Sequence, residues 1–292
     1  MTDISTEKEQ FNKFYEMLRY FDETTAEHSR RVAESNYLLA RELGLSDEMC
    51  KIAYGCGIFH DAGKISVPIE IIDSKSKLTD EQFEIIKTHP KLGIESLYDL
   101  KKANWNIRPE YFDAAGNHHK GIDGSGYGVD EKPAFYAQLT AISDVSDALS
   151  NARSYKKAWT DEEVINELIN SKKLNQELCK VYIEKVFPRI HSNVVEVDYM
   201  VSNAEKIGLP KEFVITLSRV EKPYKILFKE EDIKSFNVEK LMDSCNKVFD
   251  DFNMISMPNT IHDLWSYLND YKKAQATETV RNEVLTNKHS GR

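Results

Sequence analysis

The 292-residue sequence predicts an all-α protein, a helical bundle with a metal centre in its interior and a mostly helical C-terminal extension. Apolar residues recur at intervals of three and four, and polar N-cap residues precede several of these stretches, which predicts the helices. Histidine and aspartate side chains recur about every 25 to 32 residues near expected helix ends, which predicts the centre, because two antiparallel helices return a chain to one end of a bundle over that interval.

Composition and charge exclude several classes of protein. The sequence is 41% hydrophobic and 30% charged, as in soluble globular proteins. No apolar run approaches the ~20 residues that a bilayer span needs, and the first residues do not resemble a signal peptide. The net charge of −9 argues against binding of duplex DNA or RNA. Four cysteines without CxxC spacing indicate reduced thiols in a cytoplasmic protein.

The first expected helix covers residues 1–22, with Phe11 and Phe14 on its apolar face, and is expected to pack on the domain that follows. The second opens at His28, and Gly44 ends it.

Ser46 is the expected N-cap of a third helix, which brings His60 and Asp61 to its end. A histidine followed by an aspartate suits a centre of two metal ions, because the carboxylate can bridge them. Gly63 is expected to end this helix in a left-handed turn.

Thr79 and Gln82 form an expected capping box, and the helix that begins there is expected to end at His89, before Pro90. A purely structural role stays open for each histidine at an expected helix end, because its side chain can hydrogen-bond to the last carbonyl groups of the helix.

Pro109 begins the next expected helix, which ends near His118 and His119. Adjacent histidines point about 100° apart around a helix, so both can enter one bundle interior only near a helix end. The glycine-rich loop 123–128 follows.

A strong helix is expected from Ala134 to Asn151, with Asp144 on a stripe of small residues. A carboxylate there would be desolvated unless it were paired or bound to metal. Asp147 lies off the stripe and is expected to be solvated or to cap the helix. The sequence suggests three parts: helix 1–22, a main domain at 23–189, and a C-terminal region of unknown role at 190–292.

The spacing predicts one cluster of nitrogen and carboxylate ligands without cysteine. Such a set suits iron, manganese or another first-row divalent ion better than a structural zinc site. The expected ligands of two divalent ions are His28, His60, Asp61, His89, His118, His119 and Asp144.

This cluster predicts phosphodiester chemistry. Two cations bridged by Asp61 would lower the pKa of a trapped water to give a hydroxide nucleophile, and would stabilise charge on the phosphate. Lys64, Arg153 and Lys156 are candidates to hold phosphate oxygens.

The ordered motifs over residues 20–175 resemble the HD superfamily and its HD-GYP branch. They are His28-Ser29-Arg30-Arg31-Val32, His60-Asp61-Ala62-Gly63-Lys64, Lys77-Leu78-Thr79, His89-Pro90, His118-His119, Asp123-Gly124-Ser125-Gly126-Tyr127 and Ser143-Asp144-Val145-Ser146-Asp147-Ala148-Leu149.

The resemblance implies a helical enzyme that hydrolyses cyclic dinucleotides, chiefly bacterial cyclic di-GMP, at two or three iron or manganese ions. It implies metal ligation by the seven residues above and a catalytic role for Asp61 and Lys64. It also assigns substrate binding to Lys64, Arg153, Lys156, Asp123, Gly124 and Tyr127.

Three departures from the family pattern bear on the site. Gly128 stands where the family has proline, which predicts a looser loop, and Lys120 stands where it usually has glutamate. Thr24 stands where some members supply a glutamate to a third ion, so two ions are expected.

The expected function is therefore metal-dependent hydrolysis of a cyclic dinucleotide. Two alternatives stay open: a phosphohydrolase acting on another nucleotide or phosphorylated metabolite, and a low-activity nucleotide-binding sensor or scaffold. Residues 190–292 are the expected contact for a protein partner or a homodimer, and neither nucleic-acid duplexes nor membrane insertion are expected.

Overall fold

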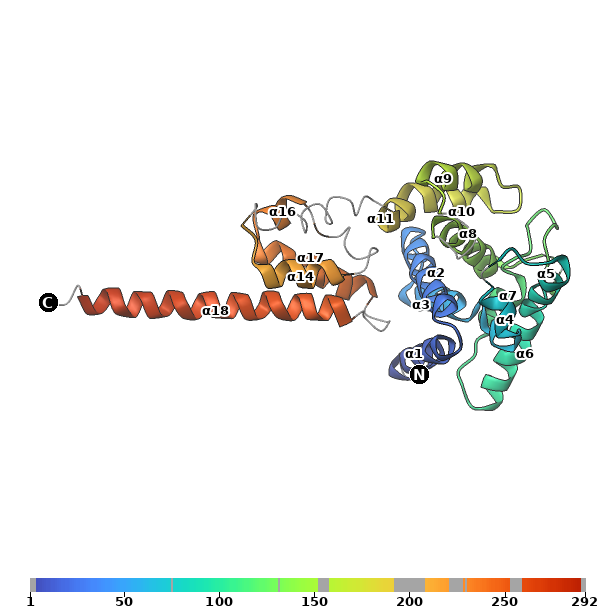
Figure 1. The fold of residues 1–292 in the computed structure, drawn as a ribbon, viewed down its shortest axis with the longest axis horizontal. Coiled ribbons are helices and arrows are strands. Elements are labelled where there is room, and N and C mark those ends of the chain that lie inside the picture. Colours follow the sequence, from blue (N-terminus) through green and yellow to red (C-terminus); the bar gives the residue numbers. More distant parts are fainter. Residues whose placement is uncertain are drawn as a thin grey trace. The chain divides into compact units, whose positions relative to one another are not determined.

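The computed structural model describes residues 4–74, 76–130, 132–151, 158–191, 208–220, 228, 230–252 and 259–289. Within these residues every regular element is helical (Figure 1). The chain divides into two compact units, Met1–Pro188 and Arg189–Arg292.

The first unit is a bundle around α2, which packs on α1, α3 and α8, while α7 contacts α3, α6 and α8. Its elements are α1 (Ile4–Phe21), α2 (Glu23–Glu42), α3 (Asp47–Phe59), the 3-10 helix η1 (Ala62–Ser66), α4 (Ile69–Ile72), α5 (Asp80–Ile86), α6 (His89–Lys102), α7 (Pro109–Asn117), α8 (Phe135–Ser150), α9 (Asp161–Asn170), α10 (Gln176–Val181), the π-helical turn η2 (Tyr182–Val186) and α11 (Phe187–His191), which crosses the unit boundary.

Local sequence fixes where these helices begin. The Asp22 carboxylate accepts a hydrogen bond from a backbone amide in the first turn of α2, and Ser46 does the same for α3. Thr79 and Thr160 form capping boxes at the starts of α5 and α9. Gly44, with a φ of +73°, follows α2 in the left-handed conformation that glycine favours.

An aromatic cluster fills the core beside the end of α3. Phe59 is 1% exposed, and its ring lies 4.7 Å from that of Phe14 on α1 and 5.2 Å from that of Tyr111 on α7. Because His60 follows Phe59 directly, this cluster holds the backbone that leads into His60 and Asp61.

Three expectations about helix ends are wrong. α2 begins at Glu23, more than one turn before His28. Gly63 does not form a left-handed turn; it lies inside η1, where a Cβ would stand 2.0 Å from the His89 carbonyl oxygen. Position 63 requires glycine because η1 approaches α6 too closely there for a Cβ. His89 does not end α5 but begins α6, with Pro90 in the first turn.

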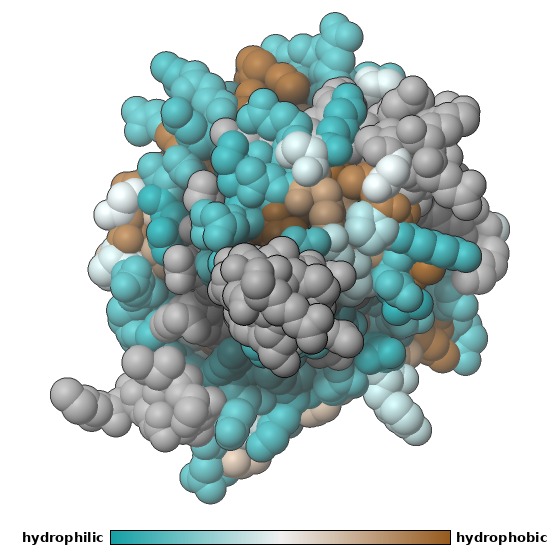
Figure 2. Space-filling view, turned by 90° about the vertical axis from the view of Figure 1, so that its left-hand side faces the viewer, coloured by the Kyte–Doolittle hydropathy of each residue, from teal (hydrophilic) through white to brown (hydrophobic). Residues whose placement is uncertain are grey.

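The second unit consists of α14 (Lys211–Arg219), α16 (Glu230–Lys234), α17 (Val238–Phe252) and α18 (Asn259–His289) within its described residues. α18 contacts α14 and α17, and fully buried Phe213, Leu241, Leu264 and Leu268 form the core. No described helix combines the length and apolar character of a membrane span. Hydrophilic side chains predominate on the described surface in Figure 2, with apolar ones scattered between them.

Candidate metal centre

The structure brings together all seven side chains that the sequence singles out as ligands. They come from α2, the end of α3, the start of α6, the end of α7 and the middle of α8. Donor atoms within each of three overlapping groups lie within 4.8 Å of one another: His89, His118 and His119; His28, His60 and Asp144; and His60, Asp61 and His118.

The Asp61 carboxylate lies between two sets of histidines. Its Oδ2 is 3.2 Å from His60 Nε2 and 3.7 Å from His28 Nε2. Its Oδ1 is 3.4 Å from His89 Nε2 and 3.9 Å from His118 Nε2. The two oxygens of one carboxylate therefore face different nitrogen donors, which is the arrangement of a bridging ligand between two ions.

Backbone carbonyls fix the tautomers of three histidines. The Nδ1–H of His60 donates to Gly57 O at 2.7 Å, and those of His89 and His118 donate to the carbonyls of Ile86 and Ala114 at 2.7 and 2.8 Å. A carbonyl only accepts, so each Nε2 presents a lone pair to the interior.

These lone pairs fit a bound cation. His89 Nε2 lies 3.2 Å from His118 Nε2, and two lone pairs at that distance repel when both rings are neutral. His60 Nε2 and Asp61 Oδ1 are buried and have no hydrogen-bond partner. Buried acceptors without partners are costly, and a divalent ion that accepts these lone pairs removes the cost. The residues present thus fit a metal centre.

Protonation at neutral pH also suits ligation at most positions. Burial lowers the pKa of His89 to about 3 and lowers the pKa of His118 well below its usual value. Burial opposes ionisation of Asp61, but the charge of the nearby Lys64 ammonium holds its pKa well below the usual range. Neutral imidazoles and ionised carboxylates are the forms that bind metal.

His28 is the exception. Burial opposes its protonation, but hydrogen bonds to Asp144 and Asp147 outweigh burial and raise the pKa of His28 to about 9. Its Nε2 is 3.1 Å from Asp144 Oδ1, so in the metal-free protein a proton occupies this position, and a cation must displace it.

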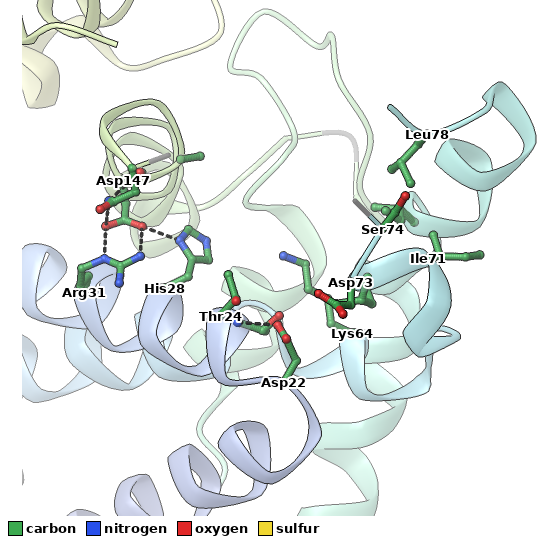
Figure 3. Close-up of a pocket in the computed structure, with 15 residues that line it drawn as sticks. Asp22, Thr24, His28, Arg31, Lys64, Ile71, Asp73, Ser74, Leu78 and Asp147 are labelled. Carbon is green, nitrogen blue, oxygen red and sulfur yellow. Dashed lines mark hydrogen bonds and ion pairs between the residues drawn. The ribbon is translucent and has the colours of Figure 1, made fainter. Parts of the chain in front are cut away.

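Asp147 is the functional residue that sequence reasoning missed. The sequence suggested a solvated or capping side chain, but Asp147 is only 8% exposed. Its Oδ2 accepts a hydrogen bond from His28 Nδ1 at 2.7 Å. Arg31 holds both oxygens of this carboxylate, at 2.7 and 2.9 Å (Figure 3). The available signal was its position three residues after Asp144, which places both side chains on neighbouring parts of one helix face.

A pocket of about 250 Å³ opens beside the centre (Figure 3). Lys64 lines it, with its Nζ 2.6 Å from Asp61 Oδ2, and the aliphatic side chains of Ile71, Leu78 and Ile86 form an apolar part of its wall. Asn151 lines it at the end of α8. The expected phosphate-binding residues that follow, Arg153 and Lys156, lie outside the described residues.

The glycine-rich loop places its three expected substrate residues differently. The Tyr127 ring packs on the His119 ring at 4.7 Å, at the centre itself. Asp123 and Gly124 are exposed, and the Asp123 carboxylate accepts hydrogen bonds from the amide and hydroxyl of Ser125. Asp123 thus closes a turn within the loop.

Comparison with known proteins gives a family match and curated relatives. The HD domain family model matches residues 13–176. The chain is 35% identical over 154 residues to a cyclic di-GMP phosphodiesterase of Pseudomonas aeruginosa, covering 52% of this chain and 36% of that protein. It is 38% identical over 146 residues to 3'3'-cGAMP-specific phosphodiesterase 1 of Vibrio cholerae, covering 49% and 32%.

The chain therefore spans about a third of the length of these two relatives. Among solved structures it is similar to a HDG"Y"P protein from Bdellovibrio bacteriovorus, with a TM-score of 0.44 and 20% sequence identity over 54% of this chain and 50% of that one.

Proposed function

The chain belongs to the HD domain family, and on that premise we propose that it is a metal-dependent phosphodiesterase that hydrolyses a cyclic dinucleotide, with cyclic di-GMP and 3'3'-cGAMP as the first candidates. The observation that supports this most strongly is the convergence of five imidazoles and two carboxylates, including two buried ligand atoms that have no hydrogen-bond partner. The relatives named above act on these two nucleotides.

The proposed cofactor is a pair of divalent ions, iron or manganese, because the donors are nitrogen and oxygen without sulfur. His28, His60 and Asp144 would hold one ion, and His89, His118 and His119 the other, with Asp61 shared. When bound, such ions activate water and offset the negative charge that develops on a phosphodiester.

The chain's own residues supply the rest of the proposed mechanism. Lys64 stands at the pocket edge, where its ammonium group can bind a phosphate oxygen. Arg31 also lines the pocket, but its bidentate pair with Asp147 assigns it to holding His28 in place. We propose that Arg153 and Lys156, which follow the pocket residue Asn151, bind the second phosphate.

The pocket favours a nucleotide over inorganic phosphate. Its apolar wall of Ile71, Leu78 and Ile86 provides contact for the flat face of a nucleobase, while Lys64 provides charge for a phosphate. Four buried free thiols suit a reducing compartment, so we propose a cytoplasmic location. A partner surface on residues 190–292 stays a prediction.

The test is a hydrolysis assay. Protein loaded with Mn²⁺ or Fe²⁺ under reducing conditions is incubated with cyclic di-GMP, 3'3'-cGAMP and unrelated phosphate esters, and the products are separated by chromatography. A linear dinucleotide, lost in Asp61→Ala, supports the proposal. Arg153→Ala should raise KM and leave metal content unchanged. Turnover of unrelated esters alone, or tight nucleotide binding without product, would refute it.

A further inference from the structure

Asn117 stands at the junction between the glycine-rich loop and the paired histidines. It is the last residue of α7, directly before His118 and His119, and it is 0% exposed. A fully buried carboxamide needs partners for two N–H donors and for its oxygen, because each unpaired group costs free energy.

All of these groups are paired, and most of the bonds reach forward into the loop. The side-chain oxygen accepts hydrogen bonds from the backbone amides of Val129 and Asp130, at 3.1 and 3.0 Å. Nδ2 donates to the Asp130 carboxylate at 2.7 Å and to the Asp113 carboxylate at 2.9 Å. One side chain therefore binds Val129 and Asp130, directly after the loop, to α7.

The chemistry of this junction selects asparagine. Aspartate could accept from the two amides, but its charge would face the carboxylates of Asp113 and Asp130 at hydrogen-bond distance. Alanine would leave both backbone amides without this acceptor. The carboxamide is the group that offers an acceptor on one side and two donors on the other.

Gly128 fits tightly against the same side chain. A Cβ at Gly128 would lie 2.9 Å from Asn117 Oδ1 and 3.0 Å from Gly116 O. The sequence suggested that this glycine loosens the loop; in the structure it instead permits close contact between the loop and the end of α7.

The loop in turn holds a metal ligand. The Tyr127 amide donates to His119 O at 3.3 Å, and the Tyr127 ring covers the His119 ring. The His119 side chain is 28% exposed, whereas those of the other four histidine ligands are at most 7% exposed. His119 therefore depends on the loop for its orientation more than they do.

We propose that Asn117 is a positioning residue, which locks residues 126–130 against α7 and thereby fixes Tyr127 over His119 so that this imidazole is oriented for metal binding. The inference rests on the proposed metal centre. Partners that orient a ligand typically change metal affinity by about 10- to 100-fold.

The test compares Asn117→Ala with a matched control, Asn175→Ala. Asn175 also accepts from two backbone amides, those of Glu177 and Leu178, and its Nδ2 donates to Gln138 on α8, six residues before Asp144. Mn²⁺ affinity is measured by calorimetric titration, and hydrogen exchange by mass spectrometry of peptides that contain residues 126–130. Asn117→Ala should weaken Mn²⁺ binding about tenfold and speed exchange in these peptides, while Asn175→Ala should do neither.

A double-mutant cycle adds a second measurement. Gly128→Ala should also weaken Mn²⁺ binding, because its new Cβ would crowd the carboxamide. In the Asn117→Ala background only the contact with Gly116 O and Lys120 remains, so the two losses should be less than additive. Wild-type exchange and affinity in Asn117→Ala, equal losses in Asn175→Ala, or additive losses in the cycle would each overturn the inference. If the wild-type protein binds Mn²⁺ but hydrolyses no cyclic dinucleotide, only the proposed activity is refuted. The role of Asn117 is still tested, because that test measures Mn²⁺ affinity and not hydrolysis.

Discussion

Replacement of Asp147 by asparagine should weaken metal binding without touching a ligand. The carboxylate accepts from His28 Nδ1 at 2.7 Å and holds Arg31 through two further bonds of 2.7 and 2.9 Å. In the wild type, the charge of the Asp147 carboxylate orients His28 and makes its Nε2 more basic. Asp147→Asn preserves the shape of the side chain but removes this charge. Loss of such a partner typically costs about 10- to 100-fold in metal affinity, which corresponds to about 1.4 to 2.7 kcal/mol.

The same change should destabilise the fold. The Arg31 side chain is 26% exposed and would lose the carboxylate that binds it through two hydrogen bonds. Removal of one member of a buried ion pair costs about 3–5 kcal/mol, and partial exposure of Arg31 places the expected loss at about 3 kcal/mol.

Mn²⁺ titration and thermal unfolding in chelator measure the two effects separately. The control is Asp99→Asn, which breaks an exposed pair with Lys102 and should leave both stability and Mn²⁺ affinity nearly unchanged. If Asp147→Asn lowers stability but binds Mn²⁺ as tightly as the wild type, Asp147 supports the fold alone and its role in orienting His28 is refuted.

Three further predictions follow from the geometry. Lys64→Ala should lower kcat/KM about 100-fold without weakening Mn²⁺ binding, because Lys64 contacts Asp61 Oδ2 as a competing cation; coincident loss of metal would contradict this. Mn²⁺ affinity should rise with pH between 7 and 9, with release of about one proton in calorimetry at pH 7, because in the metal-free protein the pKa of His28 is raised to about 9. The raised pKa of His28 also stabilises the metal-free fold; this stabilisation is fully present below about pH 6.5 and is lost as pH rises through about 9. If neither the Mn²⁺ affinity nor the stability of the metal-free fold changes with pH, the raised pKa of His28 is contradicted. Phe59→Ala should cost about 3–5 kcal/mol in chemical denaturation, because the ring is fully buried between α1 and α7, whereas Tyr98→Ala, at a side chain 53% exposed, should cost far less.

Helix content and the ligand set were predictable because both depend on local spacing. Capping residues such as Ser46 and Thr79 act within a few residues of themselves, so their effect is visible in sequence. The seven candidate ligands could be grouped because return of the chain to one end of a bundle produces a regular interval between them, and the structure brings their side chains together. Their binding of metal stays a prediction.

The features that were missed depend on contacts between distant segments. The role of Asp147 appears only when α2 brings His28 and Arg31 to it, 119 and 116 residues away in the chain. Gly63 was interpreted by its own backbone preference, whereas its actual constraint is the approach of α6. Gly128 was interpreted by comparison with proline, whereas its constraint is the side chain of Asn117.

Gly57 has a consequence for how the protein can discriminate between cations. A Cβ at this position would lie 2.3 Å from the Ala33 Cα, so the main chains of α2 and α3 touch near His28 and His60. Dense backbone contact of this kind resists sliding or separation of the two helices. The distance between these two imidazoles is therefore set by the scaffold, and a bound ion would have to match it, whereas His119, 28% exposed, is held by the loop rather than by contact between helix backbones.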